Sequence, residues 1–177
     1  MMDFKCLYAR HIHPELMGLA SYASELAGDD DMPKVSRFDP GGIPAILPYV
    51  FLVEHLPGEG DYVFRLCGER MHAIFGADLT GVRMSQIINA PVQNCMRYSY
   101  GRVISERTPQ FMRARYLWPH KSLSVERLLI PMKNDAGQVS TICGIAVPDV
   151  AAVDLDMFRG TGPAQLVCDE ELMLKAA

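Results

Sequence analysis

Residues 110–147 read QFMRARYLWPHKSLSVERLLIPMKNDAGQVSTICGIAV, and they carry the clearest strand pattern in the chain. It predicts three strands, at Gln110–Trp118, Leu123–Met132 and Val139–Val147, because apolar side chains alternate or cluster over each run. The loop Lys133–Gly137, which ends in glycine, is typical of a hairpin connection between the last two strands. We therefore expect three consecutive strands that pair antiparallel.

A second predicted hairpin lies upstream, where the strands Tyr49–Leu56 and Asp61–Cys67 flank a short glycine-containing turn. Between the two hairpins, the apolar spacing indicates a short helix at Glu69–Phe75 and a long helix over about 89–107. Another helix is predicted near the N-terminus, at Pro14–Ala27. This order indicates an α+β fold, with a five-stranded antiparallel sheet, helices on one face and an additional N-terminal helix.

The chain of 177 residues has the length of one domain. Its composition, 49% hydrophobic and 21% charged, is typical of a globular protein and excludes a disordered or coiled-coil chain. We expect an N-terminal helical extension over 1–33, the domain itself over 34–148 and a tail over 149–177. The sequence leaves three possibilities open for the tail: a disordered segment, an added strand or a docking segment.

The net charge of −4 argues against nucleic acid as a partner. The longest apolar run, Ala45–Val53, contains a proline and is far shorter than the roughly 20 residues of a membrane span, and no secretory signal precedes it. We therefore expect a cytoplasmic protein without a membrane partner. The charge is uneven, since Arg97–Arg127 holds seven basic and two acidic residues, whereas 148–177 holds six acidic and two basic. The basic stretch is either an anion-binding surface or the polar sides of a helix and two strands.

A set of short motifs extends the comparison beyond element order. In chain order they are Arg37–Pro40, Ile46–Pro48, Phe64–Gly68, Gly76–Gly81, Trp118, Glu126–Met132 and Gly137. Together they resemble a divergent PAS-domain family of small stand-alone bacterial proteins, over about residues 34–148. The resemblance implies a sensory or interaction module, without catalytic residues, that is often dimeric through an N-terminal helix and the exposed sheet face. We therefore expect a homodimer with a signalling partner protein that the sequence does not name.

A sheet with helices over one face can enclose an apolar pocket between the two layers. Methionine side chains are flexible and polarisable, so a pocket lined by several can adapt to varied apolar ligands. The residues that we expect to line it are Phe64, Met71, Phe75, Met84, Met96, Tyr100, Met112 and Tyr116. The same side chains could instead fill a solid core, in which case the protein would be a constitutive interaction adaptor without a ligand.

Few residues of the sequence support the binding of flavin or haem, which are the cofactors of better-known PAS proteins. In flavin-binding members a cysteine after the T-G loop forms a light-driven adduct, but here that position is Met84, and Cys95 lies eleven residues further on. Haem-binding members use an axial histidine, for which His55 and His72 are the candidates. We expect no flavin and keep a haem-binding sensor as the weaker alternative.

Motifs for enzyme chemistry are missing from the sequence, which has no G-x-S-x-G, P-loop, H-E-x-x-H or Rossmann glycine pattern. Its five cysteines are scattered, and His11 and His13 have only Glu15 beside them at ligand spacing, so we expect no metal site. Cys67 and His72 could act as a nucleophile and base only if the fold adds further polar groups. Arg65 interrupts an apolar strand and is expected to form an ion pair rather than to bind a ligand. We therefore expect no catalytic residues.

Overall fold

The computed structural model describes residues 4–8, 10–75, 77–86, 90–148 and 165–174. The helices are α1 (Lys5–Tyr8), α2 (Pro14–Ala27), α3 (Glu69–Phe75) and α4 (Ala90–Glu106). Short 3-10 turns are η1 (Val35–Arg37), η2 (Pro40–Gly42), η3 (Leu47–Tyr49) and η4 (Met84–Gln86). The strands are β1 (Val50–Leu56), β2 (Asp61–Cys67), β3 (Gln110–Trp118), β4 (Lys121–Lys133), β5 (Val139–Pro148) and β6 (Gln165–Met173).

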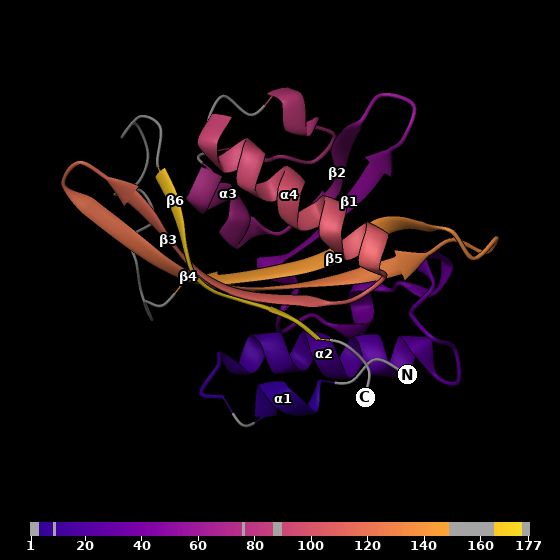
Figure 1. The fold of residues 1–177 in the computed structure, drawn as a ribbon. Helices are drawn as coiled ribbons and strands as arrows, with labels where there is room; N and C mark the ends of the chain where they lie inside the picture. Colours follow the sequence, from indigo (N-terminus) through magenta and orange to yellow (C-terminus); the bar gives the residue numbers. More distant parts are fainter. Residues whose placement is uncertain (1–3, 9, 76, 87–89, 149–164, 175–177) are drawn as a thin grey trace.

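The strands form one antiparallel sheet in the order β2-β1-β5-β4-β3-β6 (Figure 1). The α+β class and the five predicted strands are confirmed, and both predicted hairpins are present. The sheet has a sixth strand because β6, from the tail, pairs along β3. Of the three possibilities left open for the tail, residues 165–173 therefore form an added strand, while 149–164 lie outside the described residues.

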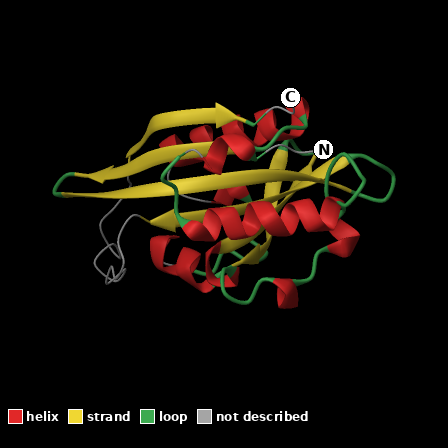
Figure 2. Ribbon diagram, turned by 90° about the horizontal axis from the view of Figure 1, so that it is seen from below, coloured by secondary structure: helices red, strands yellow, loops and turns green. Residues whose placement is uncertain are grey.

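The helix α2 covers one face of the sheet together with α1, as seen from that side in Figure 2. It begins with Pro14 at its first turn, where the missing N–H costs nothing, and it ends at Gly28, whose φ of 55° is left-handed. Its buried side chains, among them Leu16 and Leu19, pack on Leu128 and Ile130 of β4. The helices α1 and α2 therefore cover this face of the sheet.

The opposite face of the sheet is covered by α3 and α4 (Figure 1). The strand β4 supplies both cores, because alternate residues point to opposite faces. Leu123, Val125 and Leu129 face the α4 side, whereas Leu128 and Ile130 face the α2 side. No helix in the described ranges is both long enough and apolar enough to cross a lipid bilayer.

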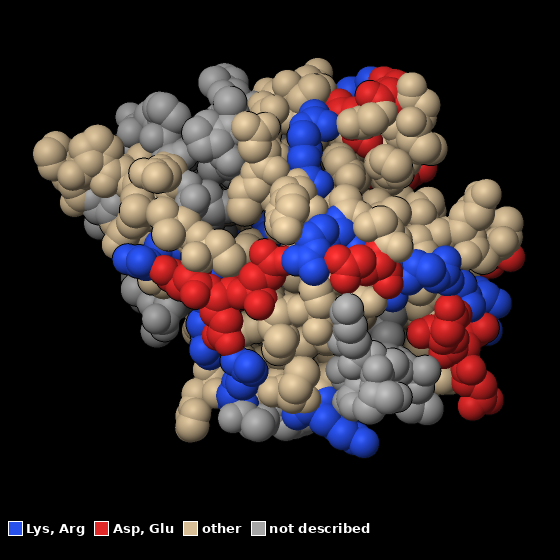
Figure 3. All heavy atoms as spheres, in the orientation of Figure 1, with Lys and Arg blue, Asp and Glu red and all other residues tan. Residues whose placement is uncertain are grey.

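Most basic side chains of the stretch Arg97–Arg127 form ion pairs. Figure 3 shows acidic and basic groups alternating in a row across the face that carries α4 and β6. The acids of β6 pair with basic side chains of its neighbours: Asp169 pairs with Arg115, Glu170 with Arg113, and Glu171 with Arg102 of α4. These side chains are thus the polar sides of a helix and strands, neutralised by the acidic tail. Arg65 also forms its expected ion pair, with Glu54 on the neighbouring strand.

Candidate functional site

A small cavity lies inside the core between the sheet and the α3–α4 layer. Its volume is about 20 Å³, enough for roughly one water molecule. It is lined by Phe51, Met71, Met96, Met112, Ala114, Tyr116, Val125, Arg127 and Ala146. Both layers contribute, because Met71 comes from α3 and Met96 from α4, while the remaining residues come from the sheet.

Half of the expected pocket residues line this cavity, namely Met71, Met96, Met112 and Tyr116. Phe64, Met84 and Tyr100 are buried in the same core but are not part of the lining. The side chain of Phe75 lies outside the described residues. The structure therefore brings methionines from three elements together, around a space much smaller than the hollow expected from the sequence.

The remaining described residues of the lining were not expected from the sequence, namely Phe51, Ala114, Val125, Arg127 and Ala146. Phe51 reaches the cavity because the residue paired with it on β5 is Gly144, where a Cβ would lie 2.2 Å from the Phe51 ring. Arg127 belongs to the motif Glu126–Met132, but it is not among the residues expected to line the pocket. The alternation of side chains along β4 could have placed it there, because Arg127 shares a face with Val125 and Leu129.

Arg127 is buried, with 6% of its surface exposed. Its Nη2 donates to the hydroxyl oxygen of Ser99 at 3.0 Å and lies 3.8 Å from the sulfur of Met112. Its Cζ lies 6.0 Å from the ring centroid of Tyr100. The Nε has no hydrogen-bond partner among the residues that the structure describes, and neither does the Tyr100 hydroxyl. Burial raises the pKa of Tyr100, so this hydroxyl stays neutral.

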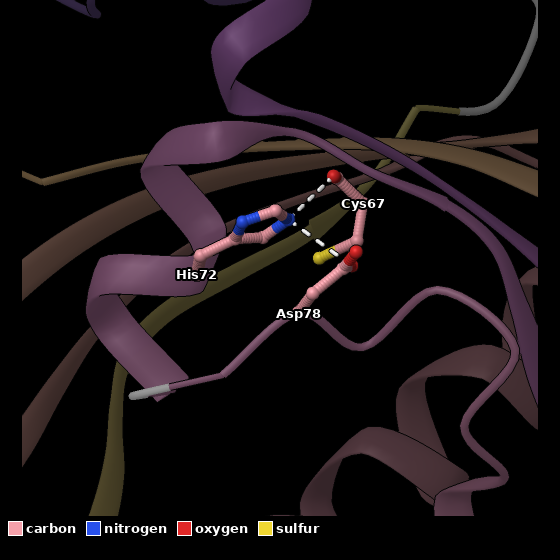
Figure 4. Close-up of side chains that lie close together, drawn as sticks. All are labelled: Cys67, His72 and Asp78. Atoms are coloured by element: carbon pink, nitrogen blue, oxygen red, sulfur yellow. Dashed lines mark hydrogen bonds and ion pairs between the residues drawn. The ribbon is translucent and has the colours of Figure 1, made fainter.

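A second cluster contains Cys67 at the end of β2, His72 on α3 and Asp78 in the following loop (Figure 4). The Nε2 of His72 lies 2.9 Å from the backbone oxygen of Cys67 and 3.1 Å from Oδ1 of Asp78. The three potential ligand atoms all lie within 4.8 Å of one another. Sulfur, nitrogen and carboxylate oxygen are together a donor set that suits zinc.

This cluster does not activate the Cys67 thiol as it stands. Burial raises the pKa of Cys67 to about 11, so the sulfur is protonated near neutral pH. Because a carbonyl oxygen only accepts, the Nε2 of His72 carries the proton that it donates to Cys67. That nitrogen has no lone pair to offer to a thiol or a metal while it carries this proton.

The remaining histidine candidates lie away from the cavity. The ring of His55 packs against Tyr62, with 5.0 Å between the centroids, and no histidine is among the described residues of the cavity lining. His11 and His13 border an open groove of about 590 Å³ on the α2 side. The charges there are already paired, since Arg113 binds both Glu126 and Glu170.

Comparison with known proteins places the chain in a family. A family model described as "PAS domain" matches residues 11–147, which include α2, the strands β1 to β4 and all of β5 but its last residue. Among solved structures, the PAS domain of BvgS from Bordetella pertussis is 18% identical, with a TM-score of 0.47, covering 61% of this chain and 81% of that chain.

A second solved structure is the VqmA–ligand–DNA complex from Vibrio cholera. It is 15% identical, with a TM-score of 0.42, and the match covers 66% of this chain and 54% of that chain. This chain thus spans about half the length of that protein. A search among curated proteins found no match.

Proposed function

The protein belongs to the PAS domain family, and from this membership we propose that it is a sensory module that binds a small molecule in its α3–α4 core. The bound molecule changes the packing of the helices, and a partner protein reads the change. The module has no catalytic activity of its own. The protonated thiol of Cys67 and the engaged nitrogen of His72 support this last point.

The observation that carries the proposal is a cavity lined from both layers by three methionines. Met71 and Met96 belong to the helical layer, and Met112 belongs to the sheet. A space of about 20 Å³ holds no ligand larger than water, so a larger ligand enters only if the side chains or helices around it move apart. A ligand that prefers this opened packing shifts the population toward it, which is the event a partner can detect.

The test follows the methyl groups of the methionines by NMR, with ¹³C-methyl methionine in the full chain. Small molecules with a six-carbon chain or one aromatic ring, both neutral and anionic, are added one at a time. We expect binders to shift the signals of Met71, Met96 and Met112. Met132, which is buried on the α2 face, serves as the internal control and should remain unchanged. A screen in which no compound shifts the cavity methionines would contradict the proposal.

A second candidate function is an interaction module without a ligand, and the small size of the cavity favours it. In this case the methionines only complete the core, and the protein binds its partner, or a second copy of itself, without a signal. It would retain a partner under conditions in which the methionine signals never respond to any small molecule. The response of the methionine methyl signals to added small molecules therefore distinguishes the two functions on the same sample.

A further inference from the structure

We propose that Arg127 makes the core cavity selective for anions, so that its ligand is a small carboxylate with an apolar body. This inference rests on the proposed ligand-binding function, which it narrows to one chemical class. It depends on the burial of Arg127, on its hydrogen-bond partners and on the apolar character of the rest of the lining.

Arg127 holds a permanent charge inside an apolar core. Its neighbours on the same face of β4, Val125 and Leu129, belong to that core, and so does Tyr100 opposite. A guanidinium stays protonated at any physiological pH, so burial cannot neutralise it. A buried charge is costly unless an opposite charge or a full set of hydrogen bonds compensates for it.

The described residues do not supply that compensation. Within them, the guanidinium of Arg127 has no carboxylate within 4.0 Å, and its contacts are to a hydroxyl, a thioether and an aromatic ring. Most other basic residues of the stretch are ion-paired: Arg97, Arg102, Arg107, Arg113 and Arg115 each have a carboxylate partner. Arg127 therefore differs from them both in its burial and in its partners.

The geometry favours a carboxylate as the missing partner. A guanidinium is a planar fork of donors that matches the two oxygens of a carboxylate, and its Nε is still unused. Ser99 already contacts the guanidinium and holds it in place. The other cavity walls, including Phe51, Met71 and Met96, are apolar and suit the hydrocarbon part of the same molecule.

The experiment compares two probes of the same shape, hexanoate and hexanamide, at constant pH and chloride concentration. Their dissociation constants are measured by calorimetry on the full chain, together with the methionine methyl shifts. Two variants are compared with the wild type, Arg127→Met and Arg115→Met. Each removes one positive charge, but Arg115 is exposed, lies on the other face of the sheet and is paired with Asp169.

We expect hexanoate to bind the wild type and Arg115→Met at least 10-fold more tightly than hexanamide. In Arg127→Met, this preference should disappear. The melting temperature of the ligand-free Arg127→Met protein should stay equal to that of the wild type or rise, because an unpaired buried charge is removed. This readout separates a ligand-selecting residue from one that only supports the fold, whose removal would lower the melting temperature.

Equal affinities of the wild type for both probes, with shifted cavity methionines, would overturn the anion inference and leave the proposed ligand binding intact. Retention of the preference in Arg127→Met would also overturn it. A shift of the cavity methionine signals by neutral compounds alone would overturn the anion inference as well. If no compound of either charge shifts these signals, the proposed function fails first and the anion inference fails with it.

Discussion

Met96 shows at the scale of one residue how full the core is. It is buried on α4 and borders the cavity, which has room for about one water. The flexible thioether can follow a change in the volume of this cavity, whereas a rigid ring cannot. The size of the side chain at this position is therefore expected to matter for stability before it matters for binding.

We predict that Met96→Trp lowers the free energy of unfolding by roughly 1–3 kcal/mol, because the larger ring overpacks a nearly filled site. Urea denaturation at neutral pH measures the loss. The control is Tyr98→Trp on the same helix, where the side chain is exposed and stability should change by less than about 0.5 kcal/mol. A Met96→Trp protein as stable as the wild type would mean that the core opens easily in the absence of a ligand.

At the scale of elements, β6 explains the charge pattern and also protects the sheet. It covers the outer edge of β3, which would otherwise offer unpaired backbone groups to other chains. Its acids neutralise Arg102, Arg113 and Arg115. After β6, Leu174 is buried in the α2-side core, and its backbone N–H donates to the carbonyl oxygen of Pro109 at 2.8 Å.

We predict that truncation after residue 164 destabilises the protein by about 2 kcal/mol through the loss of Leu174 burial alone. For a chain of this size, the melting temperature should fall by roughly 4–8 °C. The truncated protein should also associate with itself through the uncovered edge of β3, as measured by light scattering. Truncation after residue 174 is the matched control and should behave like the full chain. Equal melting temperatures for the two truncations would show that β6 adds little to the fold.

At the scale of the whole molecule, one group of charges joins the two helical layers at an end of the sheet. Lys133, at the end of β4, contacts Asp30 and Asp31 in the loop after α2. Asp31 also pairs with Arg107, which follows α4, at 3.1 Å. Both helical layers and the sheet therefore meet in this cluster, and its strength depends on the charge of the two aspartates.

We predict that this cluster makes stability depend on pH in the acidic range. The hydrogen bond from Lys133 lowers the pKa of Asp31 from 3.8 to about 2, and that of Asp30 is lowered in the same direction. A lowered folded-state pKa stabilises the protein above the unfolded value, and this contribution is lost as the pH falls through the folded value. The melting temperature of Lys133→Met should therefore lie below that of the wild type at about pH 5, and the gap should close between about pH 4 and pH 2.

The matched variant is Asp31→Asn, which removes the titrating group and keeps its shape. Its dependence on pH should be reduced in the same direction as that of Lys133→Met, while the contribution of Asp30 remains. Melting temperatures recorded by circular dichroism over this pH range provide the comparison. A gap between the wild type and Lys133→Met that stays constant down to pH 2 would show that the cluster acts through packing instead of charge.

Much of the fold followed from local patterns in the sequence. The strand β3 was predicted with its observed bounds, and α2 likewise, because alternation and helical spacing are properties of neighbouring residues. An ion pair of Arg65 was expected from the charge within an apolar strand, and the structure identifies Glu54 as its partner. In the candidate site, four of the eight expected residues were found on the cavity, because helical spacing and strand alternation place side chains on faces.

The five expected strands, their antiparallel pairing and the family all follow from the amino-acid sequence. Other features are visible only in the folded chain: residues 165–173 add a strand, α2 covers the second face, and Arg127 is buried beside Ser99 and Met112. These are contacts between residues far apart in the chain, and the periodicity of one segment carries no information about which other segment packs on it. The size of the cavity was decided in the same way, because it is the small volume left over after two layers of side chains have packed together.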